Sequence, residues 1–166
     1  MINSLNIIYG SINGNTEYVM GRIEAFLRTV LPGLIIRRVR AETAKPDDFK
    51  LADALLLGSG TWNTGGDEGQ LNPHMHALLF EHLKDVRLPG KPMAFVSLGD
   101  EQHHFITDCI GHFRLFLQNV KGEKLLQSLI LVNDPYTELE RIDRWAKDFS
   151  ETLATADASG KPDDES

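Results

Sequence analysis

The sequence has few of the residues that special kinds of site and structure need. Its 166 residues include one cysteine, Cys109, which excludes a disulfide framework and an all-cysteine metal cluster within one chain. No apolar run approaches the roughly 20 residues of a membrane span. Residues 1–4 lead into an apolar run without a basic segment or a cleavage site, so we expect no secretory signal, no membrane association and a cytoplasmic location.

Positive charge is also scarce. The chain has 17 Lys and Arg against 24 Asp and Glu, a net charge of −7. A nucleic-acid surface needs clustered basic residues, so we do not expect nucleic acid as a partner. An acidic protein is better suited to docking on a basic protein surface.

Short apolar runs alternate with amphipathic stretches along the chain. We predict strands at 5–9, 34–39, 53–59, 92–99 and 129–132, and helices at 15–30, 73–83, 104–117 and 135–154, with a turn at 44–48 and one short helical turn after it. This order predicts an α/β fold, a doubly wound five-stranded parallel sheet with helices on both faces. We place this domain at 1–156 and expect 157–166 to be a disordered acidic tail.

Unusual composition is concentrated in the loops that leave three of these strands, at 10–16, 59–69 and 99–104. Doubly wound sheets bind ligands at the carboxyl ends of their strands. We therefore predict a binding site where the three loops converge.

The first of these loops has the composition of a phosphate site. It comprises Ser11, Ile12, Asn13, Gly14, Asn15 and Thr16, and it opens directly into a helix without a Lys or Arg. Hydroxyls, amides and the backbone N–H groups of a helix N-terminus can hold a phosphate by neutral hydrogen bonds. The alternative is an ordinary strand-to-helix turn with an Asn or Ser cap.

Residues 7–16 resemble the phosphate-binding signature of the flavodoxin family, an apolar strand followed by Ser/Thr-x-Thr-Gly-x-Thr. Asn13 stands where Thr or Ser is usual, which keeps a hydrogen-bonding side chain, and Met20 stands where a small Ala is common, which is a packing change. The resemblance extends over residues 4–153 and is to the short-chain branch. It implies a flavodoxin-like fold with bound FMN.

The other two loops strengthen this resemblance. Flavodoxins carry Thr-Trp in the second loop, which implies that Trp62 stacks on the isoalloxazine ring and that the backbone of Asn63 faces flavin N5. They carry Gly-Asp and then a stacking Tyr in the third loop, where this chain has His104, with His103 or Phe105 as alternatives. The implied cofactor residues are Ser59, Gly60, Thr61, Trp62, Asn63, Thr64 and Gly65 in the second loop and Leu98, Gly99, Asp100, His103, His104 and Phe105 in the third. The alternative for Trp62 is a hydrophobic plug that anchors its loop.

Three other groups of residues carry more ordinary interpretations. His74, His76 and His82 fit a solvated helix surface better than a metal site, because His74 and His76 are two residues apart and point to different faces. Cys109 is expected to be a packed thiol, since it has no basic neighbour in the sequence. The cluster Arg37, Arg38 and Arg40 is interpreted as a solvated strand face rather than a phosphate clamp.

The resemblance implies a flavodoxin, a monomeric low-potential one-electron carrier rather than an enzyme. Its partners would be redox proteins with basic surfaces, a flavodoxin reductase and acceptor enzymes. Asp67, Glu68, Asp100 and Glu101 would lower the last potential, because negative charges oppose the anionic reduced flavin. Two alternatives remain open, an NAD(P)H-dependent FMN reductase or quinone or azo reductase with this fold, and a flavin-free binding module.

Overall fold

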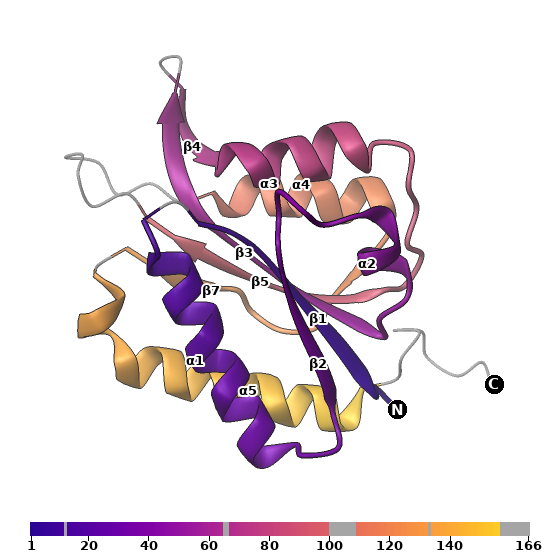
Figure 1. The fold of residues 1–166 in the computed structure, drawn as a ribbon, viewed down its shortest axis with the longest axis vertical. Helices are drawn as coiled ribbons and strands as arrows, with labels where there is room; N and C mark the ends of the chain where they lie inside the picture. The colour runs from indigo at the N-terminus through magenta and orange to yellow at the C-terminus, as the bar shows by residue number, and fades with distance from the viewer. Residues whose placement is uncertain (12, 65–66, 100–108, 133, 157–166) are drawn as a thin grey trace.

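A computed structural model describes residues 1–11, 13–64, 67–99, 109–132 and 134–156 (Figure 1). Its centre is a twisted sheet with helices on both faces. The strands are β1 (Ser4–Gly10), β2 (Ile35–Arg40), β3 (Ala54–Thr64), β4 (Asp67–Leu71), β5 (Pro92–Leu98), β6 (Glu123–Lys124) and β7 (Leu129–Leu131).

The strand order confirms the predicted doubly wound parallel sheet. It runs β2-β1-β3-β5, and both β6 and β7 pair with the outer side of β5. Every pair in this central sheet is parallel. The chain leaves β1 for β2 on one side and returns to β3 on the other, so the switch in strand order lies between β1 and β3. This is the place where sheets of this kind bind ligands.

The fifth strand position is occupied by two short strands, where one was predicted. β6 pairs with the beginning of β5 at Pro92 and Met93, and β7 pairs with its end from Val96 to Leu98. Between them, Leu125 and Leu126 are partly buried against the core. The interruption is held in place because the Trp145 indole N–H donates to the Gln127 carbonyl at 2.7 Å.

The prediction of a loop at 59–69 is wrong, because the described part of this segment belongs to two strands. β3 continues to Thr64, and β4 returns antiparallel to it, with Thr61 opposite Leu71 and Trp62 opposite Gln70. The last pair between β3 and β5 is Gly60 with Leu98, so this hairpin extends beyond the central sheet. Backbone pairing needs no apolar alternation, and Thr and Trp favour extended backbone, so a polar glycine-rich segment forms strands here.

The helices lie in two layers. They are α1 (Asn15–Val30), α2 (Pro46–Lys50), α3 (Pro73–Ala77), a π-helix (Leu78–His82), α4 (Ile110–Val120), a 3-10 turn (Pro135–Thr137) and α5 (Leu139–Thr155). α1 and α5 cover one face side by side, and α3 and α4 cover the other (Figure 1).

Three predicted helices differ in detail. The one at 73–83 is a turn of α-helix that widens to π-helix, where the Leu83 N–H donates to the Leu78 carbonyl at 3.0 Å. The one at 104–117 is described only from α4 onward, and the one at 135–154 begins as a 3-10 turn before α5.

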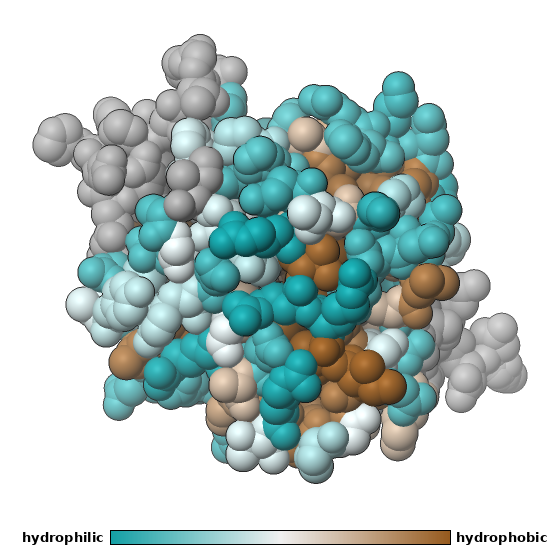
Figure 2. All heavy atoms as spheres, viewed as in Figure 1, coloured by the Kyte–Doolittle hydropathy of each residue, from teal (hydrophilic) through white to brown (hydrophobic). Residues whose placement is uncertain are grey.

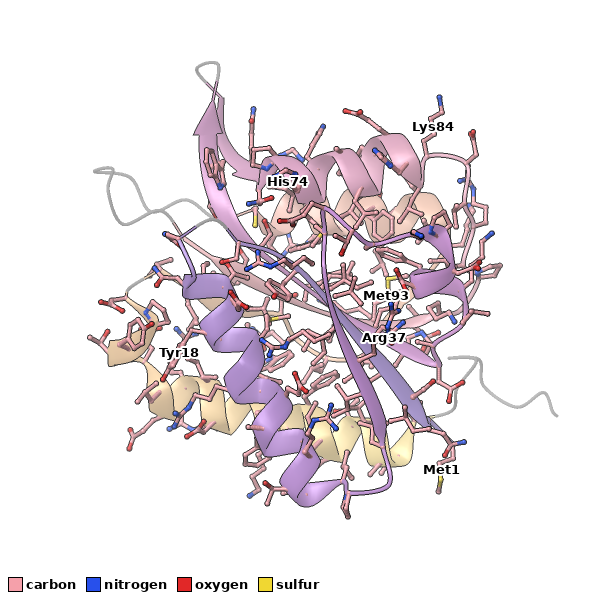
Figure 3. The ribbon with its side chains drawn as sticks, in the orientation of Figure 1. Met1, Tyr18, Arg37, His74, Lys84 and Met93 are labelled. Carbon is pink, nitrogen blue, oxygen red and sulfur yellow. The ribbon has the colours of Figure 1, made fainter. Side chains whose placement is uncertain are left out.

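The inner strands are buried on both faces, as their unbroken apolar runs predicted. Ile7 and Leu56 pack into a core with α1 and α5, whereas Ile8 and Leu57 pack into a second core with α3 and α4. Met93 lies in this second core, while Lys84 points away from the molecule (Figure 3). Polar residues cover most of the face in Figure 2. Among the described residues, no helix is long and apolar enough to cross a membrane.

Candidate functional site

The three loops predicted to converge do leave adjacent strand ends. Gly10 at the end of β1 pairs with Ser59 in β3, and Gly60 pairs with Leu98 at the end of β5. Ser11, Thr61 and Gly99, which follow these residues, therefore start from one edge of the sheet.

The first loop holds the N-terminus of α1. Gly14 adopts φ +88°, a left-handed conformation that glycine tolerates, and a Cβ there would meet nothing within 4 Å. The Asn15 N–H donates to Asn13 Oδ1 at 3.1 Å, and the Glu17 N–H donates to Ser11 Oγ at 3.4 Å. Ser11 and Asn13 thus act as local caps. The capping alternative considered above and a ligand role are compatible, because a helix N-terminus has four unsatisfied N–H groups.

The chemistry of this loop fits a phosphate group. α1 has 16 residues, long enough for its dipole to favour an anion at the N-terminus. Thr16 is 2% exposed, and a Cβ on Gly60 would lie 3.6 Å from its hydroxyl oxygen, so the first turn of α1 lies close to β3. Ile12 lies outside the described residues.

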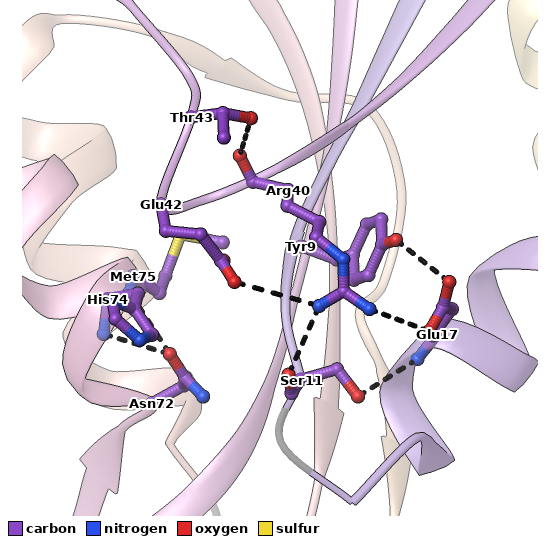
Figure 4. Close-up of polar contacts among 9 residues, drawn as sticks. All are labelled: Tyr9, Ser11, Glu17, Arg40, Glu42, Thr43, Asn72, His74 and Met75. Atoms are coloured by element: carbon purple, nitrogen blue, oxygen red, sulfur yellow. Dashed lines mark hydrogen bonds and ion pairs between the residues drawn. The ribbon is translucent and has the colours of Figure 1, made fainter.

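Arg40, which the sequence analysis assigned to a solvated strand face, contacts the start of this loop. Arg40, the last residue of β2, donates from Nη2 to Glu17 Oε1 at 3.0 Å and from Nη1 to the Ser11 carbonyl at 3.4 Å (Figure 4). Arg37 pairs with Asp48 and Arg38 with Glu24. The interpretation as a solvated face is therefore incomplete, since the three side chains are only 35% to 60% exposed and each is ion-paired. The register of β2 against β1 decides which carboxylates these arginines reach, and that register cannot be read from the sequence.

The second loop, which forms the β3–β4 hairpin, is fixed mainly by polar contacts with other parts of the chain. Ser59 is fully buried, and its hydroxyl donates to the Gly60 carbonyl at 2.7 Å and accepts from the Asn72 N–H at 2.9 Å. The Thr61 hydroxyl donates to the Leu98 carbonyl at 2.5 Å, which ties the second loop to the end of β5. Trp62 is half-buried in the hairpin. Asn63 and Thr64 belong to β3, but their side chains lie outside the description, as does Gly65.

The third loop is described only at its two ends. The Gly99 N–H donates to the Leu131 carbonyl at 2.5 Å. Cys109 is fully buried, its N–H donates to Ser97 Oγ at 3.1 Å, and its Sγ lies 3.2 Å from the same oxygen. This confirms the prediction of a packed thiol. Asp100, His103, His104 and Phe105 lie outside the described residues.

Asn72 is a further residue at this edge that sequence reasoning missed. It precedes α3 and is 1% exposed, and its Oδ1 accepts from the N–H groups of His74 and Met75. Its Nδ2 has no hydrogen-bond partner among the described residues, and Figure 4 shows this nitrogen on the side of Ser11. A Cβ on Gly10 would lie 2.7 Å from Asn72 Oδ1, which explains why glycine stands at the end of β1.

The predicted solvated histidines His74, His76 and His82 are exposed, as expected. His112 on α4 lies near them, with its ring centroid 6.3 Å from that of His76. Burial lowers the pKa of His112, and the neighbouring His76 lowers it further. Within the described residues, no three His, Cys, Asp or Glu side chains gather to hold a metal ion.

Comparison with known proteins agrees with this geometry. A probable flavodoxin 2 of Bacillus subtilis (strain 168) is 26% identical over 137 residues, which cover 81% of this chain and 85% of the relative. The crystal structure of oxidised flavodoxin 2 from Bacillus cereus matches with a TM-score of 0.75 at 22% identity, over 91% of this chain and 97% of that one. A Fusobacterium nucleatum flavodoxin mutant, described as bound to flavin mononucleotide, matches with a TM-score of 0.70 at 16% identity, over 89% and 95% of the two chains. At these identities the two structures show the fold alone.

The family model described as Flavodoxin matches residues 7–158, a range that includes all three loops and nearly all of the sheet. The chain belongs to the flavodoxin family of FMN-binding electron-transfer proteins.

Proposed function

We propose that this protein is a low-potential one-electron carrier that binds FMN non-covalently at the carboxyl ends of β1, β3 and β5. The observation that carries the proposal is the open helix N-terminus at 13–16, which lies beside the Trp-bearing hairpin at the switch between β1 and β3. FMN supplies the redox chemistry, because its flavin ring accepts and releases electrons singly. The chain supplies the binding groups and their electrostatic environment.

The phosphate end of the cofactor is assigned to the first loop. Ser11, Asn13, Asn15 and Thr16 offer hydroxyl and amide groups, and Gly14 lets the backbone approach closely. We include Ile12 on the sequence resemblance. The phosphate is held by neutral donors and the helix dipole, so it keeps its charge inside the site.

The ring end is assigned to the second and third loops. Trp62 covers one face of the flavin, and the backbone of Asn63 faces the ring. The remaining contacts are assigned to Ser59, Gly60, Thr61, Thr64, Gly65, Leu98, Gly99 and Asp100. His104 covers the other face, with His103 or Phe105 as alternatives. The Trp62 assignment is supported by the hairpin, which presents this large side chain half-exposed beyond the sheet.

The partners follow from charge. The net charge of −7 favours association with redox proteins that present basic surfaces, a reductase and its acceptors. We infer that the protein acts as a monomer in the cytoplasm. The alternative of an NAD(P)H-dependent FMN reductase requires a nicotinamide site beside the ring, and a flavin-free module requires that the loops bind no FMN.

Titration of the purified chain with FMN, riboflavin and FAD tests the proposal. We expect FMN to bind more tightly than riboflavin or FAD, and the loaded protein to accept electrons in two steps without oxidising NAD(P)H by itself. Rapid NAD(P)H consumption would favour the reductase. A chain that binds no flavin would favour the binding module.

The phosphate assignment is tested by Thr16→Ala. Loss of one hydroxyl donor to a charged group costs about 1.5–3 kcal/mol, so FMN affinity should fall tenfold or more while riboflavin affinity changes little. Thr29→Ala is the matched control, because Thr29 lies on the same helix with its exposed hydroxyl donating to the Ala25 carbonyl. Equal losses for FMN and riboflavin in Thr16→Ala would contradict the assignment.

A further inference from the structure

Arg40 contacts three parts of the chain that together frame the first loop. Its guanidinium reaches the Ser11 carbonyl at the start of the loop and the Glu17 carboxylate in the first turn of α1. Its Cζ lies 5.5 Å from the centroid of the Tyr9 ring, at the end of β1. Glu17 in turn accepts from the Tyr9 hydroxyl at 3.2 Å (Figure 4). One cation therefore links the strand before the loop to the helix after it.

The charges around this cation show what it compensates. Glu17 carries a carboxylate one residue beyond Thr16, in the first turn of α1. Glu42 adds a second carboxylate, 3.7 Å from Arg40 Nη1. A phosphate in the loop would add a further negative charge close to Glu17. Without Arg40, the carboxylates of Glu17 and Glu42 would oppose that phosphate uncompensated, because the other cation near the Tyr9 ring, Arg38, is paired with Glu24.

We propose that Arg40 is a positioning residue for the phosphate, which makes a loop without any basic residue able to hold a dianion. It acts from behind the loop by neutralising Glu17 and orienting the Ser11 carbonyl, and it does not contact the cofactor. The inference rests on the proposed function, because it requires that FMN binds at 11–16.

Arg37 offers a matched control on the same strand. Its side chain is 60% exposed and pairs with Asp48. Because successive side chains of a strand point to opposite faces, Arg37 lies on the other face from Arg38 and Arg40. The substitutions Arg37→Gln and Arg40→Gln remove the same charge. Arg37→Gln breaks the ion pair with Asp48, whereas Arg40→Gln breaks the pairs with Glu17 and Glu42. They differ in whether the lost charge lies beside the first loop.

The test compares FMN with riboflavin, which has no phosphate. We expect Arg40→Gln to lower FMN affinity about five- to tenfold at low salt, because it removes one positive charge near a dianion at a partly exposed site. Riboflavin affinity should stay within about twofold. Arg37→Gln should change neither affinity. At 0.5 M salt the loss for FMN should shrink, because salt screens half-exposed charges.

A second pair of variants separates charge from structure. Arg40→Lys keeps the charge and should retain most of the preference for FMN. Glu17→Gln in the Arg40→Gln background removes the carboxylate that Arg40 compensates and should restore the ratio of FMN to riboflavin affinity. If Arg40→Gln does not fold, Glu17→Gln alone is still informative, since the proposal predicts that it raises this ratio above that of the natural chain.

Two results would overturn the inference. One is an equal loss of FMN and riboflavin affinity in Arg40→Gln. The other is an unchanged ratio in both Arg40→Gln and Glu17→Gln. Either result leaves the proposed function intact as long as the natural chain prefers FMN. A natural chain that binds neither flavin would instead contradict the proposed function itself.

Discussion

The two helical layers of this protein are built differently, although they pack on the same sheet. α1 and α5 are regular helices of 16 and 17 residues that lie side by side, joined by a two-pronged ion pair in which Arg22 donates twice to Asp143 at 2.8 Å. On the other face, α3 has five residues before it widens to a π-helix. The regular layer carries the proposed phosphate loop at the N-terminus of α1, whereas α3 and α4 of the irregular layer contact β4 of the hairpin that carries Trp62.

This difference separates two tasks within one site. The proposed phosphate loop at 11–16 follows directly from local chemistry, a helix N-terminus with Ser, Asn and Thr around one glycine. The hairpin depends on contacts between distant segments, such as the Ser59 hydroxyl with the Asn72 N–H and the Thr61 hydroxyl with the Leu98 carbonyl. We therefore expect phosphate binding to be sensitive to changes in the loop itself, and the hairpin to be sensitive to changes in the elements beneath it.

The largest effect should come from the contact between Gly10, at the end of β1, and Asn72, which precedes α3 in the irregular layer. In Gly10→Ala the new methyl group would overlap Asn72, whose Oδ1, Cγ and Cβ all lie within 2.9 Å of the added Cβ. Asn72 is held by two backbone N–H groups and cannot move easily, so we expect the free energy of unfolding to fall by about 1–3 kcal/mol in a urea titration.

Two other glycines serve as controls for this change. Gly33→Ala should leave stability unchanged or slightly raised, since nothing lies within 4 Å of its added Cβ. Gly58→Ala should cost less than Gly10→Ala, because its added Cβ meets the flexible thioether end of Met20 at 2.7 Å. If all three variants unfold at the same urea concentration, Asn72 moves aside easily and its contact with Gly10 is not rigid.

The next effect concerns the hairpin of the irregular layer. Trp62→Ala should lower FMN affinity about tenfold, because stacking on an aromatic face contributes about 1 kcal/mol beyond its buried area. The chain has two tryptophans, and Trp145 lies in α5 with its indole N–H donating to Gln127. FMN should therefore quench the emission of Trp145→Phe strongly and that of Trp62→Phe weakly. Equal quenching of both variants would place Trp62 away from the flavin.

The smallest effect distinguishes the layers by their response to pH. Burial lowers the pKa of His112 below its ordinary value of 6.5, so the folded chain resists protonation there. The unfolded chain then binds more protons in the window below about pH 6.5, and stability should fall as the pH drops through that window. We expect His112→Gln to reduce the slope of unfolding free energy against pH between 5.5 and 7.5. α1 and α5 contain no histidine, so variants of Arg22 should leave that slope unchanged.

Much of the fold and the position of the candidate site could be predicted, because they follow from patterns within short stretches of the sequence. The apolar runs of β1, β3 and β5 predicted strands buried on both faces, and residues 10–16 predicted the helix N-terminus with its donors. The position of the site followed from the topology, since the loops at 10–16 and 59–69 leave neighbouring strand ends. Cys109 was correctly expected to be packed.

The misses depended on pairing between distant segments. The hairpin at 60–69 was predicted as a loop because β4 is polar and shows no apolar alternation. The split between β6 and β7 brings Gln127 to the distant Trp145, and the place of Arg40 depends on its register with Tyr9. Asn72 gave no signal beyond that of a helix cap, although its side chain lies against Gly10.

The arginines of β2 have a consequence for the free edge of the sheet. β2 is the first strand in the order, so among the described strands its outer backbone groups have no neighbouring strand. Such an edge can pair with another chain and start aggregation. Arg37 and Arg38 project from opposite faces of β2, so a second copy docking along this edge would bring arginines close to arginines on both faces, which like charges disfavour. We therefore expect the arginines of β2 to disfavour pairing between two copies along this edge.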